Sequence, residues 1–323
     1  MRFVLGFDGG GTKTDCVLMD ASGSVLARSQ AGPSNPLRVG FGAALAAMRD
    51  GVQKAAAAAK IPSNEKALAI CAALGGVGPA ESAEKMHILL AAEFPETKIR
   101  ICTDLESALA AAGEGSAIVV DAGTGSFAIG RNEAGDTARA GGYGSQIGDE
   151  GSAYDIGRRA ILTAMHENDR TGSDSVLGQR LLRELGCGSW SEVKARAQAA
   201  SDEVFPRLFS VVASLAEIDH AEAQQILRAA ASDLAMQAEN LADRLKLRGQ
   251  KLFIAKMGGM IGRSKFLEAQ LDEHLRNAFP NAEIGQLRIT PAEAAARLAL
   301  ELLAENGPAK ARPSKTDEAS QSK

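Results

Sequence analysis

The stretch Val4–Asp15, VLGFDGGGTKTD, decides how this chain folds. Its first half is an apolar run that ends in Asp8, and three glycines follow before the next apolar run begins. Glycine lets backbone N–H groups approach a bound anion closely, and the Thr-Lys-Thr that follows adds hydroxyls and a charge. The stretch therefore predicts a glycine-rich loop that holds phosphate.

Two common phosphate loops do not fit this stretch. A P-loop has the pattern GxxxxGK[ST] and leads into a helix, whereas here Thr12 separates Gly11 from Lys13 and a strand follows. The glycine spacing also differs from the GxGxxG of a dinucleotide-binding unit. What remains is a β-hairpin loop with the hydroxyls of Thr12 and Thr14 and the charge of Lys13. Three glycines between strands are, by themselves, equally typical of a plain turn.

The pattern of this hairpin returns once in the chain. Residues 117–136, AIVVDAGTGSFAIGRNEAGD, again contain an apolar strand ending in Asp, a Gly/Thr-rich turn, a second apolar strand and a polar turn with glycine. An internal repeat of this kind predicts two similar halves. The second loop, Asp121–Ser126, would then face the first across an inter-domain cleft.

Strands alternate with helices around both hairpins, which predicts an α/β fold with a mostly parallel core. In the first half we expect strands at 2–8, 15–20, 25–29, 68–73 and 98–103 and helices at 43–60, 80–93 and 105–112. In the second half we expect helices over 149–247, strands at 251–257 and 283–289, and a helix from residue 291. The expected domains are 1–114 and 115–306, the second with a helical insertion, followed by a disordered tail at 307–323.

Composition narrows the class of protein. The 323 residues contain 36 basic and 40 acidic side chains and are 45% hydrophobic, enough for two packed domains. The slight acidic excess and the lack of a basic stripe argue against nucleic acid as a partner. No apolar run approaches the ~20 residues that cross a bilayer, and we expect a cytoplasmic protein that does not bind membranes. The four cysteines lack a CxxC pair and are expected to be reduced and buried.

Six ordered motifs carry a resemblance to a known family. They are GFDGGGTKTD at 6–15, PSNP at 33–36, CTDLESALAAA at 102–112, DAGTGS at 121–126, GGYGSQIGDEGSAYDIGRRA at 141–160 and MGGMIG at 257–262. Up to about residue 305 the chain resembles the N-acetylglucosamine kinase and BadF/BadG/BcrA/BcrD ATPase family, within the actin, hexokinase and Hsp70 superfamily. The resemblance implies a two-domain actin-like ATPase fold of the ribonuclease H type, with a duplicated β-meander. It also implies that ATP phosphorylates an amino sugar.

The resemblance implies roles for single residues. Asp104 stands where similar kinases keep the general base that accepts the proton of the sugar 6-hydroxyl, although an aspartate there is also a common helix N-cap. Asp8 would hold the hydrated Mg²⁺ of MgATP. The implied phosphate contacts are Gly9, Gly10, Gly11, Thr12, Lys13, Gly123, Thr124, Gly125 and Ser126, with Gly258 and Gly259 beside the adenosine. The implied sugar contacts are Asn35, Gly75, Gly76, Asp104, Thr124, Gly125, Gly142, Tyr143 and Asp149.

Several of these residues also have purely structural interpretations. Asn35 could brace an Asn-Pro turn, Asp149 could cap the helix that follows it, and the glycine pair at 258–259 could form a strand-to-helix turn. The identity of the sugar is open as well. Pro36 and Leu37 follow Asn35 where an aromatic residue can help to enclose an acetamido group in N-acetylglucosamine kinases, and Tyr143 stands where a tryptophan can occur. Free glucosamine, a muramic acid derivative or another hexosamine therefore remain candidates. The family resemblance implies a homodimer.

One alternative function belongs to another class. Activator ATPases of 2-hydroxyacyl-CoA dehydratases and benzoyl-CoA reductases share the fold and hold a [4Fe–4S] cluster with two thiolates from each subunit. Here Cys102 lies inside a strand, and no exposed pair of cysteines is evident. A non-catalytic sugar sensor would be expected to lack the base, whereas Asp104 and both phosphate loops are present. The zinc motif of the ROK sugar kinases, CxCGxxGC, is absent from the sequence.

Overall fold

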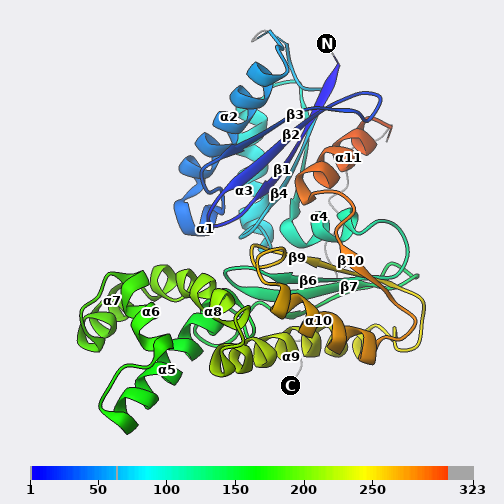
Figure 1. Ribbon diagram of the computed structural model, residues 1–323. Coiled ribbons are helices and arrows are strands. Elements are labelled where there is room, and N and C mark those ends of the chain that lie inside the picture. Colours follow the sequence, from blue (N-terminus) through cyan, green and yellow to red (C-terminus); the bar gives the residue numbers. More distant parts are fainter. Residues whose placement is uncertain (1, 63–64, 305–323) are drawn as a thin grey trace, which may run out of the picture. The chain divides into compact units, whose positions relative to one another are not determined.

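The computed structural model describes residues 2–62 and 65–304 and divides them into two compact units. The first unit contains the residues up to Gly113 together with those from Leu287, and the second contains Glu114–Gln286. Each unit is built on a five-stranded sheet with helices packed on it (Figure 1). The expected α/β class with a duplicated meander is thus confirmed.

The sheet of the first unit has the strand order β3-β2-β1-β4-β5. Its strands are β1 (Phe3–Gly9), β2 (Thr14–Asp20), β3 (Val25–Ala31), β4 (Ala69–Leu74) and β5 (Lys98–Thr103). The first three strands pair antiparallel, whereas β1, β4 and β5 are parallel. Gly9, Leu74 and Thr103 are in register at the carboxyl ends of these three strands. The segments that follow them consequently begin at one edge of the sheet, where α/β proteins commonly bind ligands.

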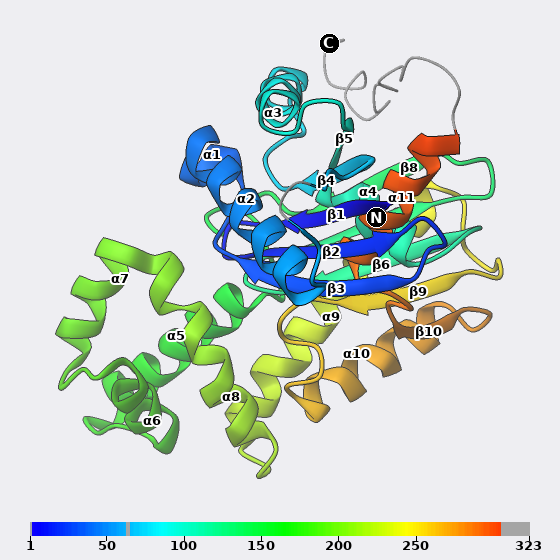
Figure 2. The same ribbon diagram turned by 90° about the horizontal axis from the view of Figure 1, so that it is seen from above.

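Helices cover both faces of this sheet, as Figure 2 shows from above. The helices are α1 (Pro36–Val39), α2 (Phe41–Ala58), α3 (Ala80–Glu93), α4 (Asp104–Ala111) and α11 (Pro291–Ala304). Leu5 and Phe7 of β1 pack with α2 and α3, while Val4 faces the opposite side and packs with α11. This alternation is what a strand buried on both faces requires. It explains why the opening stretch is apolar at nearly every position.

Helix α11 belongs to the first unit, and the expected placement of this segment in the second domain is therefore wrong. The helix packs on β1 through an alanine-rich face. A methyl group on Gly6 would lie 2.1 Å from the backbone nitrogen of Ala296 and 2.3 Å from the carbonyl oxygen of Ala292. Only glycine lets the helix backbone approach the strand this closely. The other boundary, at Gly113, lies one residue from the expected position, and the tail at 307–323 lies outside the described residues.

The sheet of the second unit repeats the first, with the order β10-β9-β6-β7-β8. Its strands are β6 (Ala117–Ala122), β7 (Ser126–Arg131), β8 (Thr137–Gly141), β9 (Phe253–Met257) and β10 (Glu283–Gln286). Again three strands form an antiparallel meander, and β6, β9 and β10 are parallel. Asp121, near the end of β6, thereby corresponds to Asp8, near the end of β1.

The long segment between β8 and β9 is helical, as expected. Its helices are α5 (Ala153–Thr171), α6 (Val176–Leu185), α7 (Trp190–Val204), a short 3₁₀ turn (Pro206–Leu208), α8 (Phe209–Ala216) and α9 (Ala221–Arg244), and α10 (Lys265–Ala278) follows β9. Helix α9 packs on β6, β7 and β8, and α10 packs on α9. Among the residues that the structure describes, no helix is both long and apolar enough to cross a membrane.

Candidate functional site

In the first unit, backbone hydrogen bonds gather three loops at the carboxyl edge of the sheet. The carbonyl of Gly9 accepts from the N–H of Gly75 at 2.8 Å, and the carbonyl of Gly10 accepts from the N–H groups of Ser34 and Asn35 at 3.1 Å each. The glycine loop after β1 is therefore held directly by the segments that carry Asn35 and Gly75. This arrangement joins the motifs at 6–15 and 33–36 with the segment that follows β4.

Asp104 opens helix α4 but does not cap it. The N-cap is Thr103, which forms a capping box with Glu106, so the N-cap interpretation of Asp104 is wrong. One carboxylate oxygen of Asp104, Oδ1, accepts from the N–H of Leu105 at 3.1 Å. A methyl group on Gly75 would lie 3.2 Å from the other oxygen, Oδ2, and 3.2 Å from Nδ2 of Asn35. Asp104 and Asn35 thus approach each other across Gly75.

Asn35 combines a structural role with a position in this group. Its Oδ1 accepts from the N–H groups of Leu37 at 3.0 Å and Arg38 at 3.3 Å, which makes it the N-cap of α1 and confirms the turn-bracing interpretation. Gly76 has a φ of +84°, and a methyl group there would lie 2.4 Å from that oxygen. The side-chain nitrogen of Asn35 points toward Gly75. We call Asp8, Asn35, Gly75, Gly76 and Asp104 the first-unit cluster.

The electrostatics of the first-unit cluster centre on Asp8. Burial raises the pKa of Asp8 to about 7, with further upward contributions from the charges of Asp104 and Asp15 and a smaller lowering by Lys13. Negative charge crowded in this way favours a cation. Mg²⁺ commonly keeps several waters and uses one or two carboxylates with substrate phosphates. The surroundings of Asp8 fit a hydrated magnesium, and no group of three side chains within the described ranges could ligate a metal directly.

The side chains of the first loop behave differently from the sequence expectation. Thr14 is buried, and its Oγ1 donates to the carbonyl of Gly32 at 2.6 Å and lies 2.7 Å from Oγ of Ser34. Its hydroxyl therefore holds the loop in place, and a contact of this hydroxyl with phosphate stays a prediction. Lys13 pairs with Asp15 at 2.7 Å, so its charge already has a partner. Thr12 is exposed at the tip of the loop.

In the second unit, the loop between β6 and β7 is joined to helix α5. Gly123 donates to the carbonyl of Gly125 at 3.0 Å, which closes the hairpin. The carbonyls of Gly123 and Thr124 accept from the N–H groups of Ala153 at 2.9 Å and Tyr154 at 3.3 Å. These bonds satisfy donors in the first turn of α5, which otherwise have no partner in the helix. Thr124 itself is exposed.

The hydroxyl of Ser126 serves the fold of this unit. It donates to the carbonyl of Glu150 at 2.7 Å and accepts from Nε2 of Gln237 at 3.3 Å. Gln237 also donates to the carbonyl of Glu150 at 3.2 Å. Ser126 is buried and its hydrogen is engaged within this unit, and its expected contact with phosphate stays a prediction.

Asp149 lies directly over the second loop. A methyl group on Gly125 would be 2.7 Å from its Oδ2. Burial raises the pKa of Asp149, while hydrogen bonds from the backbone of Gly144 and Ser126 act in the opposite direction. The N-cap of α5 is Ser152, so the capping interpretation of Asp149 is wrong. Its backbone has a φ of +59°, a left-handed conformation that is uncommon for residues other than glycine and that aspartate adopts more often than most.

The loop after β9 packs against the second hairpin. Gly258 has a φ of +102°, and a methyl group there would lie 2.5 Å from the backbone of Ala122 and 2.7 Å from Oδ1 of Asp121. The N–H of Met260 donates to the carbonyl of Ala122 at 2.9 Å. Gly259 is exposed, with open space where a side chain would be. We call Asp121, Gly123–Gly125, Asp149 and Gly258–Gly259 the second-unit cluster.

The segment with Gly142 and Tyr143 is held by Arg139. The guanidinium donates to the carbonyl of Gly141 at 3.0 Å and to that of Gly142, and it lies over the ring of Tyr143 at 6.0 Å. Gly142 has a φ of +69°, which favours glycine. The Tyr143 side chain is 68% exposed and stays available for a ligand.

Sequence reasoning missed two residues that shape the second-unit cluster. Asp121 could have been found from the repeat, because it corresponds to Asp8. Gln237 carries no such signal, since it lies on α9 and reaches Ser126 only through the fold.

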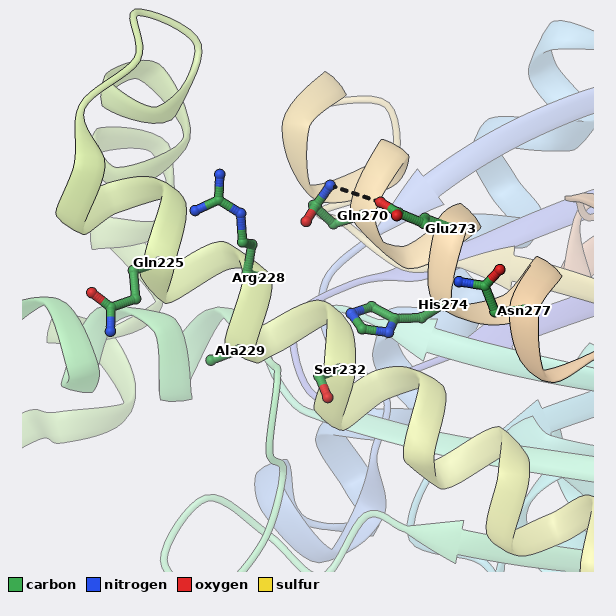
Figure 3. A pocket seen from close by; sticks show the side chains of 8 residues that line it. All are labelled: Gln225, Arg228, Ala229, Ser232, Gln270, Glu273, His274 and Asn277. Atoms are coloured by element: carbon green, nitrogen blue, oxygen red, sulfur yellow. Dashed lines mark hydrogen bonds between the residues drawn. The ribbon is translucent and has the colours of Figure 1, made fainter.

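A separate hollow lies between helices α9 and α10 (Figure 3). It has a volume of about 460 Å³, and polar side chains such as Arg228, Gln270 and His274 line it. Most of these side chains are exposed, and none of the expected site residues is among them. The hollow is therefore not the candidate site.

Comparisons with known proteins agree with the motifs. Residues 5–299 match the BadF/BadG/BcrA/BcrD ATPase family. An N-acetylmuramic acid/N-acetylglucosamine kinase from Clostridium acetobutylicum is 29% identical over 288 residues, which are 88% of this chain and 94% of that protein. An N-acetyl-D-glucosamine kinase from Dictyostelium discoideum is 29% identical over 313 residues, 92% of this chain and 97% of that one.

A solved structure has a similar fold. It comes from Chromobacterium violaceum, and its protein is provisionally named an N-acetylglucosamine kinase. It has a TM-score of 0.77 and 28% identity, and it covers 93% of this chain and 99% of that one. The similarity extends over nearly the whole chain.

Proposed function

Because the chain belongs to the BadF/BadG/BcrA/BcrD ATPase family, we propose that it is an ATP-dependent kinase of an amino sugar of the N-acetylglucosamine or glucosamine class. The observation that carries this proposal is the approach of Asp104 and Asn35 across Gly75, beside the glycine loop that follows β1. A carboxylate next to a phosphate loop suits transfer to a hydroxyl group. The relatives named as N-acetylglucosamine kinases support the choice of acceptor.

The proposed reaction is an in-line transfer in which Asp104 accepts the proton of the sugar 6-hydroxyl. Such a base needs to be ionised and within hydrogen-bond reach of the hydroxyl. The hydrogen bond from Leu105 to Oδ1 fixes the carboxylate and leaves Oδ2 on the side of Asn35. Asn35 would orient the sugar by donating from its side-chain nitrogen. Phosphoryl transfer depends mainly on positioning and charge stabilisation, which these residues would supply.

Magnesium, carried as MgATP, would neutralise charge on the transferring phosphates. Asp8 would hold it through water, which requires the ionised form of Asp8. Backbone N–H groups of the first loop would contact a phosphate, because its glycines carry no side chain that would block a close approach.

We assign ligand contacts to the second-unit cluster as well. The backbone of Gly123–Gly125 and the exposed hydroxyl of Thr124 would bind a nucleotide phosphate, and Gly259 leaves room for the adenosine. Asp149 would accept hydrogen bonds from sugar hydroxyls, with Gly142 and Tyr143 nearby in sequence. A polar site that pairs with sugar hydroxyls discriminates strongly against analogues that lack them.

No observation favours the activator ATPase. All four cysteines are buried, and Cys71 and Cys102 lie in the core of the first unit with their sulfurs 3.6 Å apart. Burial raises the pKa of Cys16 to about 12, and the contact with Cys71 raises the pKa of Cys102 well above its ordinary value. Such thiols are poor ligands, because the thiolate is the form that binds iron.

The variant Asp104→Asn tests the proposal. We expect it to fold and to bind the sugar, but to lose turnover by about 10²- to 10⁴-fold, the usual contribution of a general base. Asp50→Asn, at an exposed carboxylate of α2 that pairs with Lys54, serves as the control and should keep normal turnover. NMR of the product should show phosphate on O6. Near-normal turnover of Asp104→Asn would contradict the assignment of the base.

A further inference from the structure

Arg38 lies directly against the first glycine loop. A methyl group placed on Gly11 would be 2.7 Å from its Nη1, 2.9 Å from its Cδ and 3.3 Å from its Cζ. The two residues are far apart in sequence, and the fold brings them together. With glycine at position 11, the side chain of Arg38 lies directly on the loop.

The charge of Arg38 has no partner among the residues that the structure describes. Its side chain is exposed, and among residues 2–62 and 65–304 no hydrogen bond or ion pair of its guanidinium is found. Other arginines of the same unit are paired, such as Arg28 with Glu293 and Arg49 with Glu93. Lys13, the cation within the loop itself, is paired with Asp15. Arg38 is consequently a cation beside this loop that has no partner within the described ranges.

The position of Arg38 is fixed relative to the first-unit cluster. It belongs to α1, whose N-cap is Asn35, and the side chain of Asn35 accepts from the N–H of Arg38 itself. The N–H of Asn35 donates to the carbonyl of Gly10. The same short helix therefore carries Arg38 onto the phosphate loop and Asn35 onto Gly75 and Asp104.

We propose that the Arg38 guanidinium binds the terminal phosphoryl group of the nucleotide during transfer. The inference rests on the proposed kinase function and adds a residue to it. A guanidinium presents a planar fork of donors that matches two phosphate oxygens, and its charge does not depend on pH in the working range. The alternative anion, a carboxylate on an acidic amino sugar, is less favoured, because the guanidinium rests on the phosphate loop itself.

Arg38 takes no part in the bonds that form and break during phosphoryl transfer. The sugar oxygen forms a bond to the γ-phosphorus as the bond from that phosphorus to the bridging oxygen breaks. The hydroxyl proton passes to the carboxylate of Asp104, and ADP leaves with the electron pair. Arg38 keeps its protons and stabilises the negative charge on the peripheral oxygens of the transferring group.

The test compares Arg38→Met, Arg38→Lys and the control Arg49→Met in the full chain. Nucleotide affinity is measured by calorimetry with ADP and with AMP-PNP, each with magnesium. For Arg38→Met we expect an affinity for AMP-PNP that is lower by about tenfold and an unchanged affinity for ADP, because only the former carries the third phosphate. The kcat should fall by roughly 10²-fold with every sugar phosphorylated, and Arg38→Lys should recover part of it. Arg49→Met should behave as the wild type.

Three results would overturn the proposal. They are an unchanged kcat in Arg38→Met, an equal loss of affinity for ADP and AMP-PNP, or a loss confined to N-acetylmuramic acid while N-acetylglucosamine is phosphorylated normally. The last result would assign Arg38 to a sugar carboxylate instead. If the wild type phosphorylates no amino sugar, the proposed function fails, and the comparison of ADP with AMP-PNP still decides where Arg38 binds. Thermal unfolding of each variant shows whether it is folded.

Discussion

At the scale of single residues, Asp104 and Asp8 lie near the ends of parallel strands and have different proposed roles. Asp104 lies at the start of α4 with one oxygen bound by its own helix and the other turned to Asn35. Asp8 lies near the end of β1, where burial and the charges of Asp104 and Asp15 raise its pKa to about 7. The environment of Asp104 suits a general base for the sugar hydroxyl. The environment of Asp8 suits a residue that holds hydrated magnesium.

The raised pKa of Asp8 predicts how activity depends on pH. The ionised form is the one that would hold hydrated magnesium, and it dominates only above about pH 7 in the free enzyme. We expect kcat/KM for MgATP to fall about tenfold per unit as the pH drops below 7. Initial rates at saturating sugar between pH 5 and 9 measure this profile. A flat profile from pH 5 to 8 would argue against a role for ionised Asp8.

The raised pKa of Asp8 also makes the stability of the protein depend on pH, and this effect can be measured without an activity assay. The pKa of Asp8 is about 7 in the folded protein, against an ordinary value of 3.8. Protonation of Asp8 therefore stabilises the fold fully below pH 3.8, and this stabilisation is lost as the pH rises to 7. Asp8→Asn lacks this titration. The unfolding free energy of the wild type minus that of Asp8→Asn should therefore decrease between pH 4 and 7, by at most about 4 kcal/mol. Urea unfolding at several pH values measures this difference.

At the scale of elements, close backbone packing determines where helices and loops lie. Gly6 lets α11 rest on β1, and Gly258 lets the loop after β9 rest on the second hairpin. A side chain at either position would collide with backbone atoms, which cannot move as a flexible side chain can. Gly6 therefore fixes the packing of α11 on the strand that leads to the first loop, and Gly258 fixes the loop proposed to lie beside the adenosine.

A pair of glycine substitutions tests this packing. In Gly6→Ala the added methyl group would lie 2.1 Å from the nitrogen of Ala296, and we expect a loss of about 1–3 kcal/mol in unfolding free energy from overpacking. In Gly42→Ala, within α2, the methyl group meets nothing within 4 Å, and helix propensity should raise stability by up to about 1 kcal/mol. Chemical denaturation measures both. Equal stability of the two variants would contradict the close approach of α11.

At the scale of the whole chain, the features that depend on contiguous motifs could be predicted from the sequence. The two glycine hairpins, their meanders and the strand that leads to Asp104 were all recognisable, because each depends on residues that are neighbours in sequence. The repeat predicted two similar sheets, which the structure confirms. The site assignments and the homodimer stay predictions.

What the sequence could not predict depends on distant contacts. Thr14 and Ser126 look like phosphate donors in their motifs, yet their hydroxyls bind carbonyls of other segments. Helix α11 follows the second half in sequence but packs on β1. Arg38 has no motif of its own, and only the fold places it on Gly11. Local patterns carry no information on such partners.

The central claim is that this chain transfers phosphate from ATP to an amino sugar. The most direct measurement is ADP release from MgATP by the wild type with N-acetylglucosamine, glucosamine, N-acetylmuramic acid, N-acetylmannosamine, glucose or no sugar. We expect one of the first two sugars to raise ADP release far above the control without sugar, with one sugar phosphate formed per ADP. ATP hydrolysis that no sugar stimulates would contradict the claim.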